Sequence, residues 1–186
     1  NLTSTQHGAF SIAQLGGLTT TNATALTTTQ ISGLSSTQVG GLTKDQFDGL
    51  TTTQISNLST TQLDGVGTTL IAAMTTTQVN ALTTAQVQSL TTTQGKGFTT
   101  TQVAGLTTTQ AGNLTSTQLG GFTNAQLAAL NTTNVAGLTT TQVSGLASSQ
   151  LAGLTTAQVT ALTSTQVANL TSTQVKGLTA LQVKAL

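Results

Sequence analysis

Apolar and polar residues recur along this chain with a period of eight. From Leu2 to Ala185 the sequence divides without a gap into 23 octads with the consensus Leu-Thr-Thr-Thr-Gln-Val-Ala-Gly, whose positions we letter a to h. Position a is apolar in every octad, position e is Gln with three exceptions, and position f is usually Val, Ile or Leu. The pattern predicts one structural element per octad, with positions a and f on its buried side.

The charged residues distinguish a helix from a strand. In a strand, alternate residues share a face, so a and f would point to opposite sides and charges would fall on both. In a helix, c, d and g share one face, and e, f and the next a lie opposite. The Lys and Asp residues occupy only c, d and g, which favours the helix: Lys44, Asp45, Asp48, Asp64, Lys96, Lys176 and Lys184.

The polar positions predict how each helix begins and ends. A Thr or Ser at b followed three residues later by Gln is the pattern of a capping box, in which side chain and backbone satisfy each other's hydrogen bonds. Leu at a and Val at f then form a hydrophobic staple. Gly or Asn at h is typical of a residue in the left-handed conformation that ends a helix. We therefore expect each helix to span five or six residues.

Helices this short need neighbours, because an isolated helix requires about 12–15 residues. We predict an all-α solenoid of very short capped helices, one per octad, forming a single uninterrupted repeat domain over 1–186 that is a segment of, or a subunit in, a longer array. The alternative is a β-solenoid with Thr ladders at b and d. In the helical solenoid, position e lies on the inner side, so we expect a hydrogen-bonded glutamine ladder that includes Gln30, Gln54, Gln102, Gln142 and Gln166.

Composition excludes several classes of function. Charged residues make up 4% of the chain, with four Lys, no Arg, three Asp and one His, against about 25% in an ordinary domain. Nucleic-acid binding needs clustered basic residues, and metal sites need grouped His, Cys or carboxylates. No apolar run approaches the roughly 18 residues of a membrane span. We expect no catalytic residues, no cofactor and no metal, and hence no enzyme.

Four local features stand apart from the repeat. His7 is an isolated imidazole in an octad that we expect to be frayed, and Lys44-Asp45 with Asp48 forms the one charge cluster. Octad 66–73 has Gly67 in place of the cap and Leu70 in place of the Gln, which predicts a locally weak or kinked helix. Apolar residues occupy otherwise polar positions near the two ends and are candidates for contacts between subunits: Ile12 and Leu181.

The octad Leu-Thr-x-x-Gln-Val, as in 138–143, is similar to tandem octads in large bacterial surface or secreted proteins, and the resemblance covers the whole chain. It implies no catalytic residues. We expect a structural, non-catalytic protein, extracellular or at the cell surface, that forms a stiff rod or self-assembling filament. Its partners would be other copies of itself and a cell surface or matrix. The alternative is an adhesin or an ice-binding β-solenoid, because the octad also resembles bacterial ice-nucleation repeats.

Overall fold

The structure is a computed structural model that describes residues 2–186. These residues form 23 α-helices and no β-strand, so the predicted all-α class is confirmed. The chain divides into two compact units, unit 1 (Asn1–Gly97) and unit 2 (Phe98–Leu186), which are described separately. Every helix spans five or six residues and lies within one octad.

The helices of unit 1 begin at position c of their octads, one residue after the predicted cap. Their bounds are α1 (Ser4–Gly8), α2 (Ile12–Gly16), α3 (Thr20–Thr24), α4 (Thr28–Ser32), α5 (Ser36–Gly40), α6 (Lys44–Asp48), α7 (Thr52–Ser56), α8 (Thr60–Asp64), α9 (Thr68–Ala73), α10 (Thr76–Asn80), α11 (Thr84–Ser89) and α12 (Thr92–Lys96).

The helices of unit 2 follow the same plan. Their bounds are α13 (Thr100–Ala104), α14 (Thr108–Asn113), α15 (Ser116–Gly120), α16 (Asn124–Ala129), α17 (Thr132–Ala136), α18 (Thr140–Ser144), α19 (Ser148–Ala152), α20 (Thr156–Thr160), α21 (Ser164–Ala168), α22 (Ser172–Gly177) and α23 (Ala180–Ala185).

The threonines at position b cap these helices as predicted. Thr27 precedes α4 with extended backbone angles of φ −69° and ψ 158°, and its hydroxyl accepts a hydrogen bond from the Gln30 amide at 3.2 Å. In return, the Gln30 side-chain oxygen accepts from the Thr27 amide at 2.8 Å. Among the described helices the complete box is missing only from α3, α9, α17 and α19. Because these hydroxyls are used as caps and the described residues form no strand, the β-solenoid with a flat Thr array is wrong.

The prediction for the ends of the helices is wrong. Neither glycine nor any other residue among 2–186 has a positive φ. Gly33 after α4 has φ −79° and ψ −11°, and Ala81 after α10 has φ −80° and ψ −11°, both right-handed helical values. The amide of such a residue still donates to carbonyls of its own helix, as Ala81 does to the Thr77 oxygen at 3.1 Å. The turn therefore continues through h in a backbone conformation that Ala adopts as readily as Gly.

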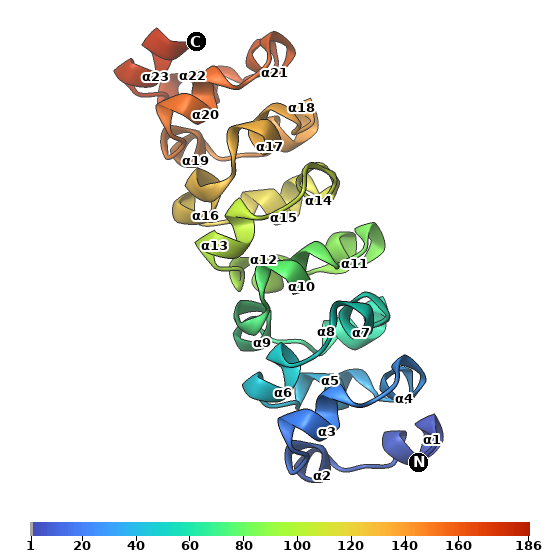
Figure 1. The fold of residues 1–186 in the computed structure, drawn as a ribbon. Coiled ribbons are helices and arrows are strands. Elements are labelled where there is room, and N and C mark those ends of the chain that lie inside the picture. Colours follow the sequence, from blue (N-terminus) through green and yellow to red (C-terminus); the bar gives the residue numbers. More distant parts are fainter. Residues whose placement is uncertain (1) are drawn as a thin grey trace. The chain divides into compact units, whose positions relative to one another are not determined.

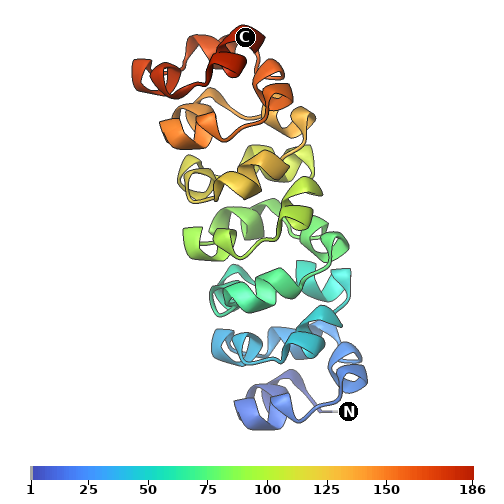
Figure 2. The ribbon, with the colours of Figure 1, turned by 90° about the vertical axis from the view of Figure 1, so that its left-hand side faces the viewer.

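Three octads complete one turn of the solenoid in each unit. The side chain of Gln54 donates to the Leu26 carbonyl 28 residues earlier, which is three octads plus the step from a to e. Helices three apart accordingly contact each other, so that α4 lies on α1 and α7 on α4 (Figure 1). We call three consecutive octads a rung. Figure 2 shows the rungs of each unit as successive layers.

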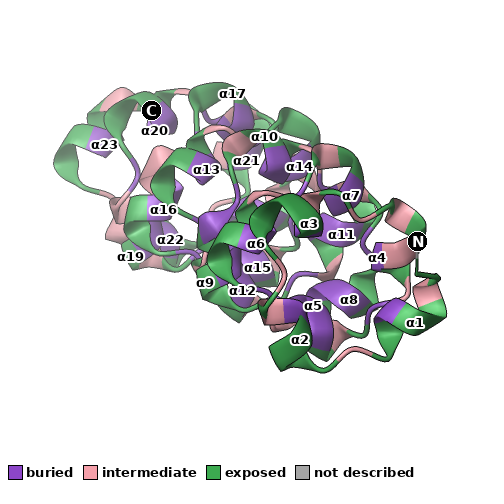
Figure 3. Cartoon of the chain, turned by 60° about the horizontal axis from the view of Figure 1, so that its bottom comes forward, coloured by how far each residue is buried: buried purple, intermediate pink, exposed green. Residues whose placement is uncertain are grey.

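The core consists of side chains from positions a and f. Leu15, Val39 and Ile55, all at f, are fully buried, and most residues at a in the interior octads are also buried. Exposed residues lie on the outward side of the helices and buried residues on the inward side (Figure 3). All seven Lys and Asp residues are exposed, in agreement with the helical pattern derived from their positions.

Glycine allows consecutive rungs to approach each other closely. At several octads with Gly at h, this position closely faces position c of the helix one rung earlier, and a side chain there has little room. A Cβ added to Gly145 would lie 2.9 Å from the Cβ of Ser116. At position g, a Cβ on Gly8 would lie 2.6 Å from the carbonyl oxygen of Gly33 in the next rung. Close packing between rungs, rather than a left-handed backbone, therefore accounts for these glycines.

Candidate functional site

The glutamines at position e combine capping of their own helix with attachment to the preceding rung. The Gln62 side-chain oxygen accepts from the Ser59 amide at 2.9 Å. Its Nε2 donates to the carbonyls of Leu34 and Ile31, each at 2.8 Å. Gln62 is buried, so both ends of its carboxamide are satisfied inside the protein. One side chain thereby joins its own cap to two octads of the rung beneath it.

The five glutamines predicted for the ladder occupy this position. Gln54, Gln142 and Gln166 are buried and donate to position a three octads earlier, each at 2.6 Å. Gln30 is partly exposed and donates to the Leu2 carbonyl at 2.8 Å. Gln102 is buried, and its side-chain oxygen accepts from the Thr99 amide at 2.7 Å.

The first rung of unit 1 presents ladder groups that no rung precedes in the described residues. Gln6 and Gln14 form capping boxes, accepting from the Thr3 and Ser11 amides at 2.8 Å. Both side chains are exposed, and within residues 2–186 their Nε2 atoms donate no hydrogen bond.

The last rung of unit 2 presents the matching acceptors. Leu162 is 9% exposed, and its carbonyl accepts no hydrogen bond from the described residues. A hollow of about 350 Å³ adjoins Leu162 and Val159 and is also lined by Val167, Ala185 and Leu186.

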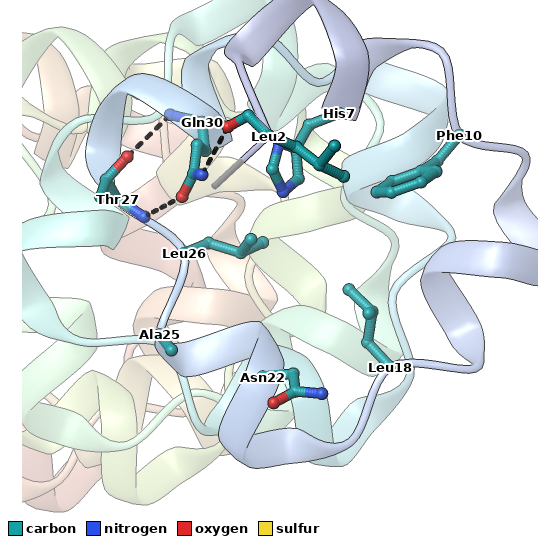
Figure 4. A pocket seen from close by; sticks show the side chains of 9 residues that line it. All are labelled: Leu2, His7, Phe10, Leu18, Asn22, Ala25, Leu26, Thr27 and Gln30. Atoms are coloured by element: carbon teal, nitrogen blue, oxygen red, sulfur yellow. Dashed lines mark hydrogen bonds between the residues drawn. The ribbon is translucent and has the colours of Figure 1, made fainter.

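A second hollow, of about 290 Å³, adjoins the first rung of unit 1 (Figure 4). The His7 imidazole points into it, with Phe10 edge-on at 5.4 Å between ring centroids. His7 is 6% exposed, and its Nδ1 lies 2.9 Å from the Thr3 carbonyl oxygen. Because a carbonyl only accepts, Nδ1 is the donor in this contact. The first octad forms a capped helix, α1, and the fraying expected there stays a prediction.

The residues lining this hollow offer limited chemistry. They are Leu2, His7, Phe10, Leu18, Asn22, Ala25, Leu26, Thr27 and Gln30. His7 is the one titratable group among them, whereas acid–base catalysis or metal binding requires a second group at hydrogen-bonding or ligand distance. Most of the lining residues occupy positions a and f, so the hollow is the open end of the unit 1 core.

Comparison with known families of repeats gives one match to this sequence. The sequence matches the ALTTAQ repeat over residues 24–52, 55–92 and 144–172, together just over half of the chain. The chain belongs to the ALTTAQ repeat family. A comparison with curated proteins found no match. The match agrees with the octads identified in the sequence and with the periodic short helices.

Exposed apolar side chains of this ALTTAQ repeat chain gather at its two ends. Ile12 on α2 is 45% exposed and lies beside Gly41, where a Cβ would come within 2.6 Å of the Ile12 Cγ2. Leu181 on α23 is 72% exposed. Their role as contacts between subunits stays a prediction. The large exposed apolar residues within 2–186 all belong to the first two or the last two octads, including the start of the next one: Leu2, Ile12, Val175, Leu181, Val183 and Leu186.

The described Lys and Asp residues of the ALTTAQ repeat helices are all exposed. Lys44, Asp45 and Asp48 are exposed on α6. Residues 2–186 hold no group of three or more His, Asp, Glu or Cys side chains placed to bind a metal ion. Over the same residues, no helix is long and apolar enough to span a membrane.

The irregular octad 66–73 forms a complete helix. Gly67 precedes α9 without a side-chain cap, as predicted, yet α9 runs for six residues and ends at Ala73. Leu70 is 6% exposed in place of the usual Gln, and Ala73 and Met74 are also buried. Apolar packing therefore replaces the hydrogen bonds that this octad lacks.

Sequence reasoning overlooked one further irregularity, at Asn134. Asn134 stands at position e of α17 and donates through Nδ2 to the Leu106 carbonyl at 2.8 Å. Its amide donates to the Asn131 side-chain oxygen at 2.8 Å. The Oδ1 atom of Asn134 is buried without a hydrogen-bond partner. The signal was the replacement of Gln by Asn, which shortens the side chain by one methylene.

Proposed function

We propose that this chain is a structural, non-catalytic segment of an extracellular or cell-surface protein, in which the octads form a stiff rod that extends into a filament. The observation that carries the proposal is the glutamine ladder. Each interior carboxamide holds its own helix cap and the rung beneath it, as Gln158 does with the Thr155 amide at 2.9 Å and the Leu130 carbonyl at 2.7 Å.

The ladder supports stiffness because it is buried in the interior octads and position e is Gln in all but three octads. A hydrogen bond inside a protein has no competing water, and it contributes about 1 kcal/mol net when it forms but leaves a penalty of about 1–3 kcal/mol when one partner is lost. Bending a rung away from its neighbour would break several such bonds together. Length can meanwhile grow without any new kind of contact, since each rung contacts only the adjacent rungs.

The outer face supports a role in assembly. Positions c and d are rich in Thr and Ser, and the sequence carries a formal net charge of +1. A surface with a net charge near zero lacks the repulsion that keeps many proteins apart. Such a face suits a spacer or filament that packs beside or on top of copies of itself.

Small-angle X-ray scattering tests the rod directly. The comparison is between the chain and a variant in which the three octads 42–65 are duplicated in tandem. We expect the same cross-sectional radius of gyration in both proteins and a larger maximum dimension in the variant, by the height of one rung. A compact particle whose dimensions grow equally in all directions would contradict the rod.

A separate experiment addresses location. In the native host, brief treatment of intact cells with a non-specific protease should degrade the protein while cytoplasmic control proteins survive. Protection of the chain until the cells are lysed would overturn the extracellular part of the proposal and leave the rod untouched.

A further inference from the structure

Asparagine at position h recurs at an even spacing along the chain. Asn57, Asn113 and Asn169 lie 56 residues, or seven octads, apart, whereas the other octads have Gly, Ala or Ser at h. In the sequence Asn1 continues the same series, outside the described residues. A solenoid turn of three octads does not require a recurrence of seven, so the fold alone does not explain where these asparagines stand.

The three asparagines share one geometry at the ends of their helices. In each, the side-chain Nδ2 donates a hydrogen bond at 2.8 Å to the carbonyl oxygen four residues earlier. Asn57 and Asn169 are exposed, and Asn113 is half-buried. The bond at Asn57 and Asn169 takes one of the two Nδ2 hydrogens, so a substituent can replace the other while this bond is kept.

The residues that follow each asparagine complete an acceptor motif for sugars. The tripeptides are Asn-Leu-Ser at Asn57 and Asn-Leu-Thr at the other two. Asn-x-Ser/Thr, where x is not Pro, is the acceptor of N-linked sugars. In the folded chain the third residue caps the next helix, since the Ser59 hydroxyl accepts from the Gln62 amide at 3.1 Å. Because the motif requires that hydroxyl, sugar transfer comes first and the cap forms afterwards.

We propose that Asn57, Asn113 and Asn169 accept N-linked sugars, one for every seven octads. The donor is a sugar activated as a diphosphate ester, and the host supplies the transferase. The asparagine Nδ2 attacks the anomeric carbon and loses one proton. A C–N bond forms as the C–O bond to the diphosphate breaks, and the diphosphate leaves with the bonding electrons. The inference rests on the proposed extracellular location, because the motif belongs to surface loops of secreted proteins.

Successive acceptors lie in different stacks of helices, because seven octads make two turns of the solenoid plus one octad. In unit 2, α14 carries Asn113 and contacts α17, which contacts α20. Asn169 follows α21, which contacts α18, and α18 contacts α15. N-linked sugars are bulky and solubilising, and here they would extend from more than one side of the same unit. Such sugars oppose side-by-side packing, which favours a single rod over a bundle of rods.

Paired substitutions in the third residue of the motif separate the sugar from the helix cap. Ser59→Asp keeps a good cap, because a carboxylate oxygen accepts from the Gln62 amide, but it removes the acceptor motif. Ser59→Thr keeps both the cap and the motif and is the matched control. Thr115→Asp with Thr115→Ser, and Thr171→Asp with Thr171→Ser, repeat the comparison at the other two sites. The acceptor asparagines are unchanged in all six variants.

Mass spectrometry of peptides from the protein isolated from its native host gives the readout, with circular dichroism to verify that each variant is folded. We expect added sugar mass at Asn57, Asn113 and Asn169 in the wild type. Each Asp variant should lose the sugar at its own site alone, and each control should retain it. One added sugar residue would identify a nucleoside diphosphate donor, and a preassembled oligosaccharide a lipid diphosphate donor.

Three results would overturn the acceptor sites. The first is unmodified asparagine at all three sites in a protein that the protease treatment places outside the cell, which would leave the proposed rod and its location standing. The second is sugar confined to Asn22 or Asn131, whose Asn-x-Thr motifs stand at positions e and b. The third is sugar retained at Asn57 in the Ser59→Asp variant. A modified chain that scatters as a compact particle would instead refute the rod alone.

Discussion

At the scale of single residues, Asn134 shows how closely the ladder depends on the length of its side chains. An Asn can reach the rung beneath, but its oxygen falls short of the cap and is buried without a partner. We expect Asn134→Gln to stabilise the chain by about 1–3 kcal/mol, because the longer side chain keeps the bond to Leu106 and brings its oxygen to the Asn131 amide. Urea unfolding followed by circular dichroism measures the change.

Replacement of the neighbouring cap provides the control for this prediction. Asn131→Thr exchanges one good capping residue for another and should change the free energy of unfolding by a few tenths of a kcal/mol. A destabilised Asn134→Gln protein would show that the buried oxygen is satisfied in another way.

Glycine at position g offers a second test, because the same residue meets different surroundings. A Cβ on Gly40 of α5 would run into the Gly65 carbonyl oxygen of the next rung, whereas a Cβ on Gly16 of α2 has nothing within 4 Å. We expect Gly40→Ala to cost about 1–3 kcal/mol through overpacking. Gly16→Ala should stabilise the helix by up to about 1 kcal/mol, since Ala loses less conformational freedom on folding. Equal effects in thermal unfolding would rule out close packing as the reason for Gly40.

At the scale of one helix, the ladder and the capping box can be separated at Gln86. Its oxygen accepts from the Thr83 amide at 2.8 Å, and its Nε2 donates to the Leu58 carbonyl at 2.7 Å. Gln86→Glu keeps the box but turns the donor into a carboxylate oxygen facing a carbonyl. Burial and that carbonyl both disfavour the charged form, so the introduced carboxyl has its pKa raised in the folded state.

A raised pKa fixes the sign of the pH dependence. The folded Gln86→Glu protein holds its proton at pH values where the unfolded chain has lost it, so stability rises as the pH falls through the raised pKa. Below the unfolded pKa of about 4.3 the destabilisation reaches its minimum, because the neutral carboxyl can donate to the Leu58 carbonyl. The wild type, with three Asp and one His, supplies the reference curve in thermal unfolding from pH 4 to 8. A variant curve parallel to it would refute the ladder's part in stability.

At the scale of the whole molecule, the helices and their inward and outward faces were predictable because each is decided within eight residues. The positions of seven Lys and Asp residues were enough to identify the outer face. The conformation at the helix ends was predicted wrongly because a recurring glycine has two common explanations, a left-handed backbone conformation and close packing of another segment. The sequence of one octad does not distinguish between these two explanations. The structure shows that packing explains glycines such as Gly145 and Gly177.

The number of octads per turn could not be derived from one octad, because it depends on which residues meet across rungs. A signal was nevertheless present in the sequence. Each glycine at position g is followed 25 residues later by a glycine at position h, which is one rung and one residue further along the chain. The pairs are Gly8 and Gly33, Gly16 and Gly41, Gly40 and Gly65, Gly112 and Gly137, and Gly120 and Gly145.

The spacing of these pairs predicts that the solenoid tolerates whole rungs better than single octads. Duplicating the three octads 42–65 keeps a glycine 25 residues after Gly40, and it adds a rung with its own glutamines. Duplicating only octad 50–57 also keeps a glutamine at every position e on either side of the insertion. It places a copy of Asn57, however, where Gly65 had met α5.

A side chain at that place is incompatible with the close approach of the two helices, because a Cβ there would overlap the Ser36 carbonyl. We expect the single-octad duplication to lower the midpoint of urea unfolding, through the overpacking cost of about 1–3 kcal/mol. The three-octad duplication should raise it or leave it unchanged, since stability in such arrays adds up from nearest-neighbour contacts. Changing Asn57 to Gly in the inserted octad should restore the midpoint. Equal midpoints for the two duplications would mean that the rungs are held by the glutamine ladder alone and that the glycine pairs do not set their order.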